Sequence, residues 1–495
     1  MTKTIAIIGS GFSSLAASCY LAQQGNKVTI YEKNESIGGR ARQFKKDGFT
    51  FDMGPSWYWM PDVFEKFFSD FNKKPNDYYE LIKLNPAYRV YFGINDFINI
   101  YDNLEAIKTT FEAIEKGSGS ELETFINQAK SNYDIAIKDL VYRPGVSPLE
   151  LITPQTALKL NQFFGNVSTD IRKKFKNERL IQILEFPVLF LGAKPTKTPS
   201  FYNFMNYADF GLGTWHPKTG MFDVVRGIEK LATELGVTIE TNAAIEKIIV
   251  ENKTATGIII NGKTIKADII LSGADYQHTE TLLDEVHRSY SEKYWESRVF
   301  APSSLLFFVG FDKKIENITH HALFFDVDFN QHAADIYDQP KWPDEPLFYA
   351  NFPSKTDESA APNGMESGFF LIPLAPGIKD TEELREEYFK KIITRFEELT
   401  QQKIRNNIIF KRSFCKNDFV ADYNAYKGNA YGMANTLFQT AFLRPKLKSK
   451  KVRNLYFTGQ LTVPGPGVPP ALISGKLVAE LIHQSLRSQK DEITI

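Results

Sequence analysis

The sequence predicts an α/β protein whose parallel sheet is assembled from separated segments, with an α+β domain interleaved between them. Three observations lead to this prediction. Residues 4–32 read as a strand, a glycine turn, a helix and a second strand; residues 224–275 return to that alternation; and residues 454–484 read as a strand, a Gly/Pro loop and a helix. A chain of 495 residues is also long for a single core, so two domains are expected.

The first segment has the order of a dinucleotide-binding βαβ unit. Its glycines allow the backbone to approach a pyrophosphate, and the helix that follows directs free N–H groups at that charge. Glu32 follows Ser14 by 18 residues, where a carboxylate accepts a hydrogen bond from a ribose hydroxyl and disfavours NADP. Ser14 occupies the place of the third glycine and is small enough to keep the helix close to the strand. The predicted cofactor contacts in this turn are Gly9, Gly11, Phe12, Ser13 and Ser14.

Composition excludes several classes of function. The net charge is zero, which argues against binding to nucleic acid. The two cysteines, Cys19 and Cys415, provide neither a disulfide framework nor metal-ligand spacing, so a reducing, cytoplasmic location and no metal site are expected. Forty Phe and 22 Tyr indicate a large aromatic lining.

No signal peptide and no uncharged apolar run of membrane-spanning length is visible, so any membrane contact is expected to be peripheral. A helix is predicted over residues 121–142, and a broken helical region over 149–191. This insertion, about 121–191, interleaves aromatic with basic residues, which suits an anionic membrane surface; a solvated charged helix face is the alternative. The residues concerned are Phe163, Phe164, Phe175 and Phe186 with Arg172, Lys173, Lys174, Lys176 and Arg179.

Later segments are predicted in turn. The aromatic stretch 201–210 can line an apolar tunnel. Residues 245–268 read as an antiparallel meander with a hairpin turn at Asn261-Gly262. Strands and one long helix between about 290 and 424 predict a mostly antiparallel substrate domain, in which His320 and His321 point apart and have structural roles. The domain division is therefore 1–70, 218–290 and 425–495 for the cofactor, and 71–217 and 291–424 for the substrate.

Several motifs carry a family resemblance. Gly38-Gly39-Arg40 after the βαβ unit, the Asp-x-Gly-Pro segment at residues 52–55, residues 211–217 and the loop Pro464-Gly-x-Gly-Val-Pro resemble the flavin amine oxidase superfamily, specifically bacterial phytoene-desaturase-like carotenoid desaturases. The resemblance extends over the whole chain. It implies a Rossmann-like FAD-binding domain of the glutathione-reductase/amine-oxidase type.

The resemblance also implies positions for FAD. Arg40 would supply a cation beside the pyrophosphate. The last helix would direct its N-terminus at the flavin pyrimidine ring. The residues around 459–462 depart from the usual family pattern there. The further implied contacts are Lys33, Gly39, Gly54, Pro55, Ser56, Ile245 (through its backbone), Gly459, Gln460, Val468 and Pro469.

The implied activity is desaturation of a carotenoid by hydride transfer to flavin N5 and loss of a proton, with oxygen or a quinone as final electron acceptor. The substrate is phytoene-like or a later carotenoid, with a lean towards the branch that acts on 1-hydroxycarotenoids (3,4-desaturases). Asp139 and Arg143, an i,i+4 pair, can supply a proton acceptor or form a surface ion pair.

Two alternatives stay open. A flavin amine oxidase on the same scaffold needs a polar, aromatic-caged site for an amine. A prenyl-lipid escort protein keeps the fold without catalysis, although Glu32 and the Gly39-Arg40 motif argue against it.

Overall fold

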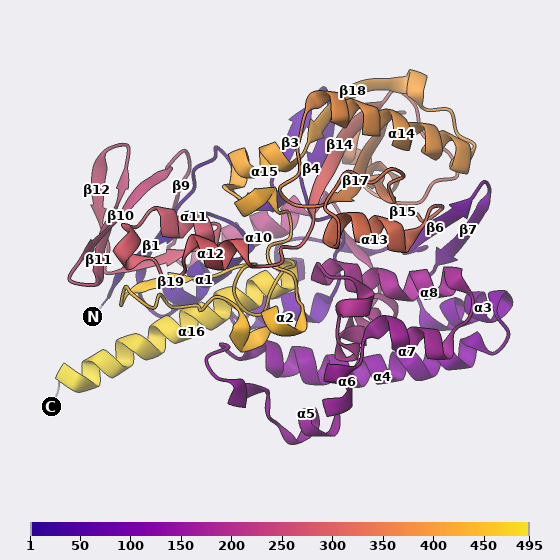
Figure 1. Ribbon diagram of the computed structural model, residues 1–495. Helices are drawn as coiled ribbons and strands as arrows, with labels where there is room; N and C mark the ends of the chain where they lie inside the picture. The colour runs from indigo at the N-terminus through magenta and orange to yellow at the C-terminus, as the bar shows by residue number, and fades with distance from the viewer. Residues whose placement is uncertain (1, 494–495) are drawn as a thin grey trace.

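A computed structural model describes residues 2–493 as two sheets and a helical layer (Figure 1). The first sheet has five strands that all run parallel, in the order β19-β13-β1-β2-β9. The central strand β1 is buried on both faces from Ile5 to Ile8, as expected when helices cover both sides of a parallel sheet. The strands are β1 (Thr4–Ile8), β2 (Lys27–Tyr31), β9 (Thr238–Glu240), β13 (Ile269–Ser272) and β19 (Leu455–Phe457).

Both ends of the chain pack together beside this sheet. Helix α1 (Phe12–Gln23) contacts α16 (Val468–Ile493), the long yellow helix of Figure 1, and α10 (Phe222–Glu234). The crossing of α1 and α16 requires glycine at position 475, because a Cβ there would lie 2.5 Å from the carbonyl oxygen of Ser13 and 2.8 Å from the Cβ of Ala16. The last helix is thus fixed directly on the first.

The predicted meander is confirmed. Strands β10 (Ile245–Glu251), β11 (Thr254–Ile260) and β12 (Lys263–Lys266) form a separate antiparallel sheet. Asn261 and Gly262 both adopt positive φ, 50° and 69°, as a two-residue hairpin turn requires.

The second large sheet has seven strands in the order β18-β14-β17-β16-β15-β6-β7, and only β15 and β6 pair in parallel. One face is covered by α14 (Glu382–Thr400), seen at the upper right of Figure 1, which packs Phe389 against Phe307. The other face is covered by the hairpin β3 (Gln43–Lys46) and β4 (Phe49–Asp52), where Phe44 contacts Phe308. The remaining strands are β6 (Tyr88–Gly93), β7 (Asp96–Ile100), β14 (Ser303–Phe311), β15 (His321–Phe324), β16 (Phe348–Asn351), β17 (Glu366–Leu374) and β18 (Ile408–Phe414).

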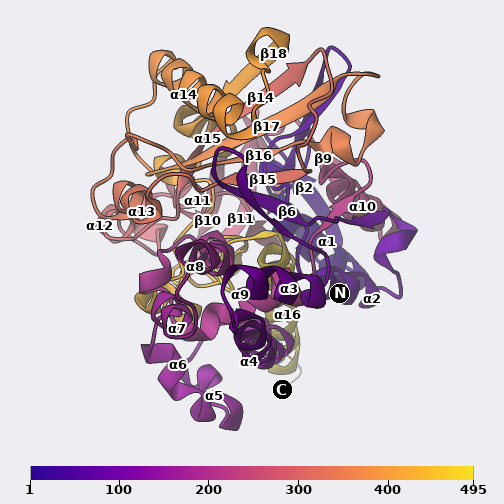
Figure 2. The same cartoon turned by 90° about the vertical axis from the view of Figure 1, so that its right-hand side faces the viewer.

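A helical layer lies on the opposite side of the molecule from α14 (Figures 1 and 2). The helix predicted over 121–142 begins earlier and ends at Lys138, followed by a 3₁₀ turn, and the region 149–191 consists of short helices. The layer comprises α3 (Leu104–Ile114), α4 (Ser118–Lys138), α5 (Pro154–Leu158), α6 (Leu160–Phe164), α7 (Val167–Lys174), α8 (Glu178–Glu185) and α9 (Phe204–Asn206). Shorter elements are α2 (Pro61–Ser69), β5 (Leu81–Lys83), β8 (Trp215–Pro217), α11 (Tyr276–Thr281), α12 (Glu292–Glu296), α13 (Phe329–Tyr337) and α15 (Lys416–Tyr423).

The two large sheets draw their strands from the residue ranges that were predicted for the two interleaved domains. The parallel sheet draws its strands from 1–70, 218–290 and 425–495, and the seven-stranded sheet from 71–217 and 291–424. The domain boundaries themselves stay a prediction. Within residues 2–493, no helix combines the length and the apolar character needed to cross a bilayer.

Candidate functional site

A cavity of about 990 Å³ lies between the parallel sheet, the seven-stranded sheet and the helical layer. It begins at the carboxyl ends of β1 and β2, where open α/β sheets bind their ligands. All of the predicted cofactor residues except Ser14 line it. They are Gly9, Gly11, Phe12, Ser13, Glu32, Lys33, Gly39, Arg40, Gly54, Pro55, Ser56, Ile245, Gly459, Gln460, Val468 and Pro469.

Glu32 is held rigidly at one end of this cavity. Its Oε2 accepts hydrogen bonds from the backbone N–H and the hydroxyl of Ser10, at 2.9 and 2.7 Å. Its Oε1 accepts from the backbone and side-chain nitrogens of Asn34, both at 2.9 Å. These hydrogen bonds from both sides fix the orientation of the carboxylate at the end of β2.

Glycines line the cavity where the chain turns from β1 into α1. An added Cβ at Gly11 would meet no protein atom within 4 Å, so a side chain there would project into the cavity. Gly39, at φ +55°, approaches so closely that its Cβ would lie 3.3 Å from the Cα of Gly11. At Gly54 a Cβ would collide with the carbonyl oxygen of Arg40, at 2.2 Å. The three glycines therefore form a cradle of bare backbone.

Arg40 places an uncompensated cation at this cradle. One of its Nη atoms donates to the carbonyl of Asn429 at 3.2 Å, and its guanidinium lies 5.3 Å from the ring centre of Tyr423. Among the described residues, its buried Nε has no hydrogen-bond partner and no carboxylate lies at ion-pair distance. Burial lowers the pKa of the Arg40 guanidinium, with Asp275 acting in the opposite direction. A half-buried cation beside bare backbone fits the diphosphate of a dinucleotide.

Ser14 has a different position. It is fully buried, and its Oγ lies 2.0 Å from where a Cβ of Gly273 would be. The small side chain at 14 is thus accommodated by the missing side chain at 273, at the end of the neighbouring strand β13. The structure places Ser14 in the packing layer beneath the cradle.

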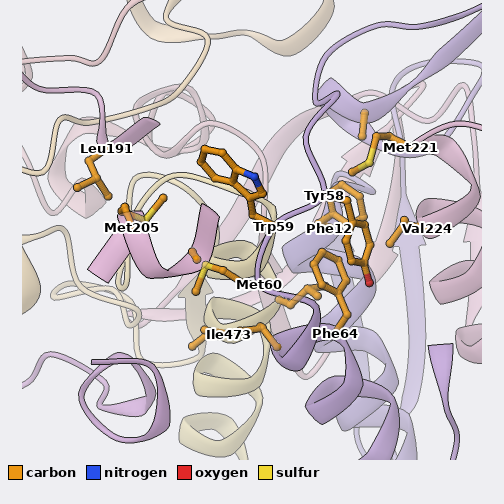
Figure 3. Close-up of a cluster of buried hydrophobic side chains, with 14 of the residues drawn as sticks. Phe12, Tyr58, Trp59, Met60, Phe64, Leu191, Met205, Met221, Val224 and Ile473 are labelled. Atoms are coloured by element: carbon orange, nitrogen blue, oxygen red, sulfur yellow. The ribbon is translucent and has the colours of Figure 1, made fainter. Parts of the chain in front are cut away.

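The other half of the cavity is apolar. Figure 3 shows Trp59 and Met60 on the side of Leu191 and Met205, whereas Tyr58 turns away towards Phe64. As predicted, the aromatic stretch 201–210 contributes, although only part of it lines the cavity. Acidic side chains occur only at the two ends of the described lining. The main apolar contributors are Trp57, Trp59, Phe186, Leu191, Phe201, Phe204, Met205, Leu306, Leu323, Phe325 and Phe329, and the acidic ones are Glu32, Glu150, Asp275 and Asp422.

Asp139 and Arg143 lie at the outer end of the cavity. Their side chains form an ion pair of 2.6 Å, in which the Asp139 side chain is 54% exposed. Arg143 lines the cavity, whereas Asp139 is absent from the described lining. The pair is therefore present as predicted, with the carboxylate on the solvent side.

Exposed apolar side chains surround this outer end. Leu149 is 71% exposed and Phe438 76%, and Phe438 itself lines the cavity. We call the following exposed set the apolar rim: Val146, Leu149, Ile152, Leu158, Phe164, Phe438 and Leu443.

The basic residues of the insertion do not form a free cationic surface. Arg172 pairs with Glu178 at 2.7 Å, and Arg179 with Asp96 at 2.6 Å. Lys173 and Lys174 also have carboxylate partners, at 3.0 Å each. Phe175 is buried, as is Phe186. Four of the five basic residues therefore pair with carboxylates, which favours the alternative of a solvated charged helix face; contact of the insertion with a membrane stays a prediction.

The structure contradicts the expectation that the side chains of His320 and His321 point apart. Their ring centres are 4.5 Å apart, and the ring of His216 lies 4.3 Å from that of His320. The side chains converge because His320 lies just outside β15, where the backbone is no longer held to strand alternation. No group of three or more His, Cys, Asp or Glu suited to a metal ion occurs in residues 2–493.

Some lining residues were missed from sequence. Ala274 and Asp275 follow β13, and Asp422 and Tyr423 end α15 against the Glu32 end. The segment after β13 carried a usable signal, since it follows a parallel strand next to β1. The end of α15 carried none, because only tertiary packing brings it to the site.

Comparison with known proteins gives one consistent result. The family model described as flavin containing amine oxidoreductase matches residues 12–483. The chain is 40% identical to a carotenoid 3,4-desaturase of Haloarcula japonica, covering 98% of this chain and 99% of that protein. It is 30% identical to a zeta-carotene-forming phytoene desaturase of Myxococcus xanthus, covering 97% and 93%. A crystal structure of an oxidoreductase from Methanosarcina mazei shares the fold, with a TM-score of 0.66, 16% identity and coverage of 96% and 100%.

Proposed function

The chain belongs to the family of flavin-containing amine oxidoreductases, and from this we propose that it is a FAD-dependent carotenoid desaturase. The observation that carries the proposal is the continuity of the cavity. A rigid dinucleotide end, with Glu32 and the uncompensated Arg40, opens into a long apolar half without carboxylates. A polyene fits such a space, whereas an ammonium group would find no anionic partner beside the flavin.

The residues at the dinucleotide end are assigned to FAD as follows. Glu32 holds the adenosine ribose, beside the backbone of Ile245, and Arg40 with the cradle glycines holds the diphosphate. The segments at Gly54-Pro55-Ser56 and Val468-Pro469 enclose the flavin ring. When bound, FAD supplies the two-electron oxidation of a substrate C–H bond. The chain positions that bond, keeps water out with apolar walls and receives the proton.

The similarity to relatives supports a substrate later than phytoene. Identity is 40% to the 3,4-desaturase and 30% to the phytoene desaturase. We therefore infer a hydroxylated or monocyclic carotenoid in preference to a phytoene-like one, with oxygen or a quinone as electron acceptor. Asp139, held by Arg143 on the solvent side of the outer end, is the alternative to the proton acceptor that is proposed in the next subsection.

The apolar rim supports association with a membrane surface, from the cytoplasmic side, for loading of the substrate. An exposed apolar patch at a cavity entrance is typical of such a site. Phe438→Ser should reduce cosedimentation with liposomes while leaving the FAD spectrum unchanged. Ile409→Ser is the matched control, since Ile409 is also exposed but lies on β18, outside the rim. Equal loss of liposome binding in both variants would contradict this assignment.

Product analysis tests the proposed function. The protein is supplied with FAD and with liposomes that contain phytoene, lycopene or a hydroxylated carotenoid, and products are separated by chromatography. We expect a more conjugated product from at least one carotenoid. Oxidation of amines without any change in a carotenoid would instead establish an amine oxidase. A colourless protein that takes up no FAD would indicate the escort-like alternative.

A further inference from the structure

A chain of hydrogen bonds leads from the apolar half of the cavity into the seven-stranded sheet. Ser56 and Tyr349 both line the cavity, and their hydroxyl oxygens are 2.9 Å apart. The Tyr349 hydroxyl lies 2.7 Å from Nδ1 of His321, which is completely buried on the adjacent strand β15. Ser56 lies two residues after the cradle residue Gly54. This series of hydrogen bonds therefore starts beside the proposed flavin position.

The direction of these hydrogen bonds follows from Asn351. Its Nδ2 donates to the carbonyl of His320 at 3.1 Å, which fixes the amide orientation, and lies 3.2 Å from Nδ1 of His321. Since Nδ2 can only donate, Nδ1 of His321 is an acceptor and its proton resides on Nε2. Tyr349 therefore donates to His321. The Oγ of Ser56, 2.9 Å away, is a second acceptor within reach of the same Tyr349 proton.

Other buried imidazole rings lie beyond His321, on the side away from Tyr349. In the described part of the protein, the buried Nε2 atoms of His321 and His320 have no hydrogen-bond partner, nor has either ring nitrogen of His216. Nδ1 of His320 lies 2.8 Å from the hydroxyl of the half-buried Thr356. A second cavity, of about 20 Å³, is lined by Ser56, His216 and Asn351 and is large enough for a water molecule. The hydrogen bonds themselves end at Nδ1 of His321, and the ring of His320 lies beyond it, 4.5 Å from that of His321 between ring centres.

The environment of His321 favours passage of a proton over its retention. The indole of Trp57, which lines the main cavity, stacks on the imidazole at 4.0 Å with an interplanar angle of 11°. Burial holds the pKa of His321 well below its usual 6.5, and the neighbouring His216 acts in the same direction. A weak base is sufficient here, because a proton next to an electron-deficient carbon is strongly acidic.

We propose that Tyr349 is the proton acceptor of the desaturation and that His321 receives the proton that Tyr349 gives up. The proposal rests on the proposed function. A hydride, which is one proton with two electrons, leaves the first carbon for the flavin, and that carbon becomes electron-deficient. The C–H bond of the neighbouring carbon then breaks, its electron pair becomes the new π bond, and the proton goes to the Tyr349 oxygen as the tyrosine's own proton moves to Nδ1 of His321. The imidazolium passes its Nε2 proton towards His320, Thr356 and the small cavity.

Single substitutions in the FAD-loaded enzyme test this relay. Tyr349→Phe removes only the hydroxyl. His321→Asn keeps an acceptor for the Tyr349 hydrogen bond but cannot be protonated. Both should lower kcat by about 100-fold or more with little change in KM, unfolding temperature or FAD spectrum. The double variant should be no worse than either single one, because the two residues act as a unit. Tyr58→Phe is the matched control, since its buried hydroxyl contacts Tyr79 outside the cavity.

A second measurement separates the relay from a structural role. With a substrate deuterated at the carbon that loses the proton, the isotope effect on turnover should be larger in Tyr349→Phe than in the wild type, because proton loss becomes rate-limiting. His321→Gln, which also keeps an acceptor but cannot be protonated, offers the same comparison should His321→Asn fail to fold.

The possible outcomes are distinct. Tyr349→Phe with a kcat within about threefold of wild type and an unchanged isotope effect would overturn the relay alone. Loss of turnover in Asp139→Asn, with Tyr349→Phe active, would place the acceptor at the outer end of the cavity. A wild-type enzyme that converts no carotenoid would overturn both the relay and the proposed function.

Discussion

Replacing Gly11 with valine should abolish retention of FAD without unfolding the protein. Gly11 lines the cavity at an ordinary φ of −68°, and a Cβ there meets no protein atom within 4 Å. The valine side chain therefore meets no clash in the free protein and occupies the space that a diphosphate needs. The local cost is about 1 kcal/mol, because valine is a poor residue at the N-cap of α1.

The effect on binding is larger. Moving a diphosphate away from the cradle removes two charge-assisted hydrogen bonds, each of which contributes about 1.5–3 kcal/mol. The binding free energy of FAD therefore becomes less favourable by about 3–6 kcal/mol. That corresponds to an increase in the Kd for FAD of about 10²- to 10⁴-fold. Gly11→Ala, with a smaller side chain, should fall between the wild type and Gly11→Val.

Titration of the apoprotein with FAD, followed by flavin fluorescence, measures this difference. Thermal unfolding of the same apoproteins provides the control for folding. A Gly11→Val protein that is purified yellow and binds FAD with wild-type affinity would refute the placement of the diphosphate at the cradle.

Three further results are expected. Arg40→Met should weaken FAD binding by about 10- to 100-fold, measured by the same titration, and leave the apoprotein at least as stable, because an uncompensated half-buried cation is removed. Gly273→Ala should destabilise the protein by about 1–3 kcal/mol in denaturant unfolding, since its Cβ collides with the Ser14 hydroxyl, and adding Ser14→Ala should recover most of that loss. Burial raises the pKa of Asp209 from 3.8 to about 7, so the folded state favours the protonated form and the wild type loses stability as pH rises through this window. Asp209→Asn lacks that titration, so its free energy of unfolding should increase relative to that of the wild type between about pH 4 and 7. A difference in free energy of unfolding that stays constant over this range would contradict the raised pKa of Asp209.

The dinucleotide end of the site was largely predictable from sequence, because its signals are local. The glycine turn, Glu32 and the motif at Gly39-Arg40 each lie within a few residues of the element that positions them, and all line the cavity. Hairpin and meander predictions succeeded for the same reason: Asn261-Gly262 specifies its own turn.

At the substrate end, only the apolar nature of the lining could be predicted from sequence. Aromatic richness indicated an apolar lining, but which rings face the cavity depends on tertiary packing: Tyr58 points into the core while its neighbour Trp59 lines the cavity. The pairing of the basic residues of the insertion could not be predicted, because ion partners such as Asp96, distant in sequence from Arg179, do not appear in local patterns. The convergence of His320 and His321 escaped detection because the rule of alternation applies only within a strand.

The crossing of α16 over α1 has a consequence for biosynthesis. The turn after β1 leaves the ribosome early, yet Gly459 to Pro469, which complete the cavity, and Gly475, which meets Ser13 and Ala16, emerge only near the end of translation. The nascent chain therefore carries the glycine cradle without the segment that closes the cavity over it, and we expect flavin to be captured only after synthesis is almost complete. Incorporation of FAD is in this sense the last folding step, and a chain truncated before residue 459 would be released without its cofactor.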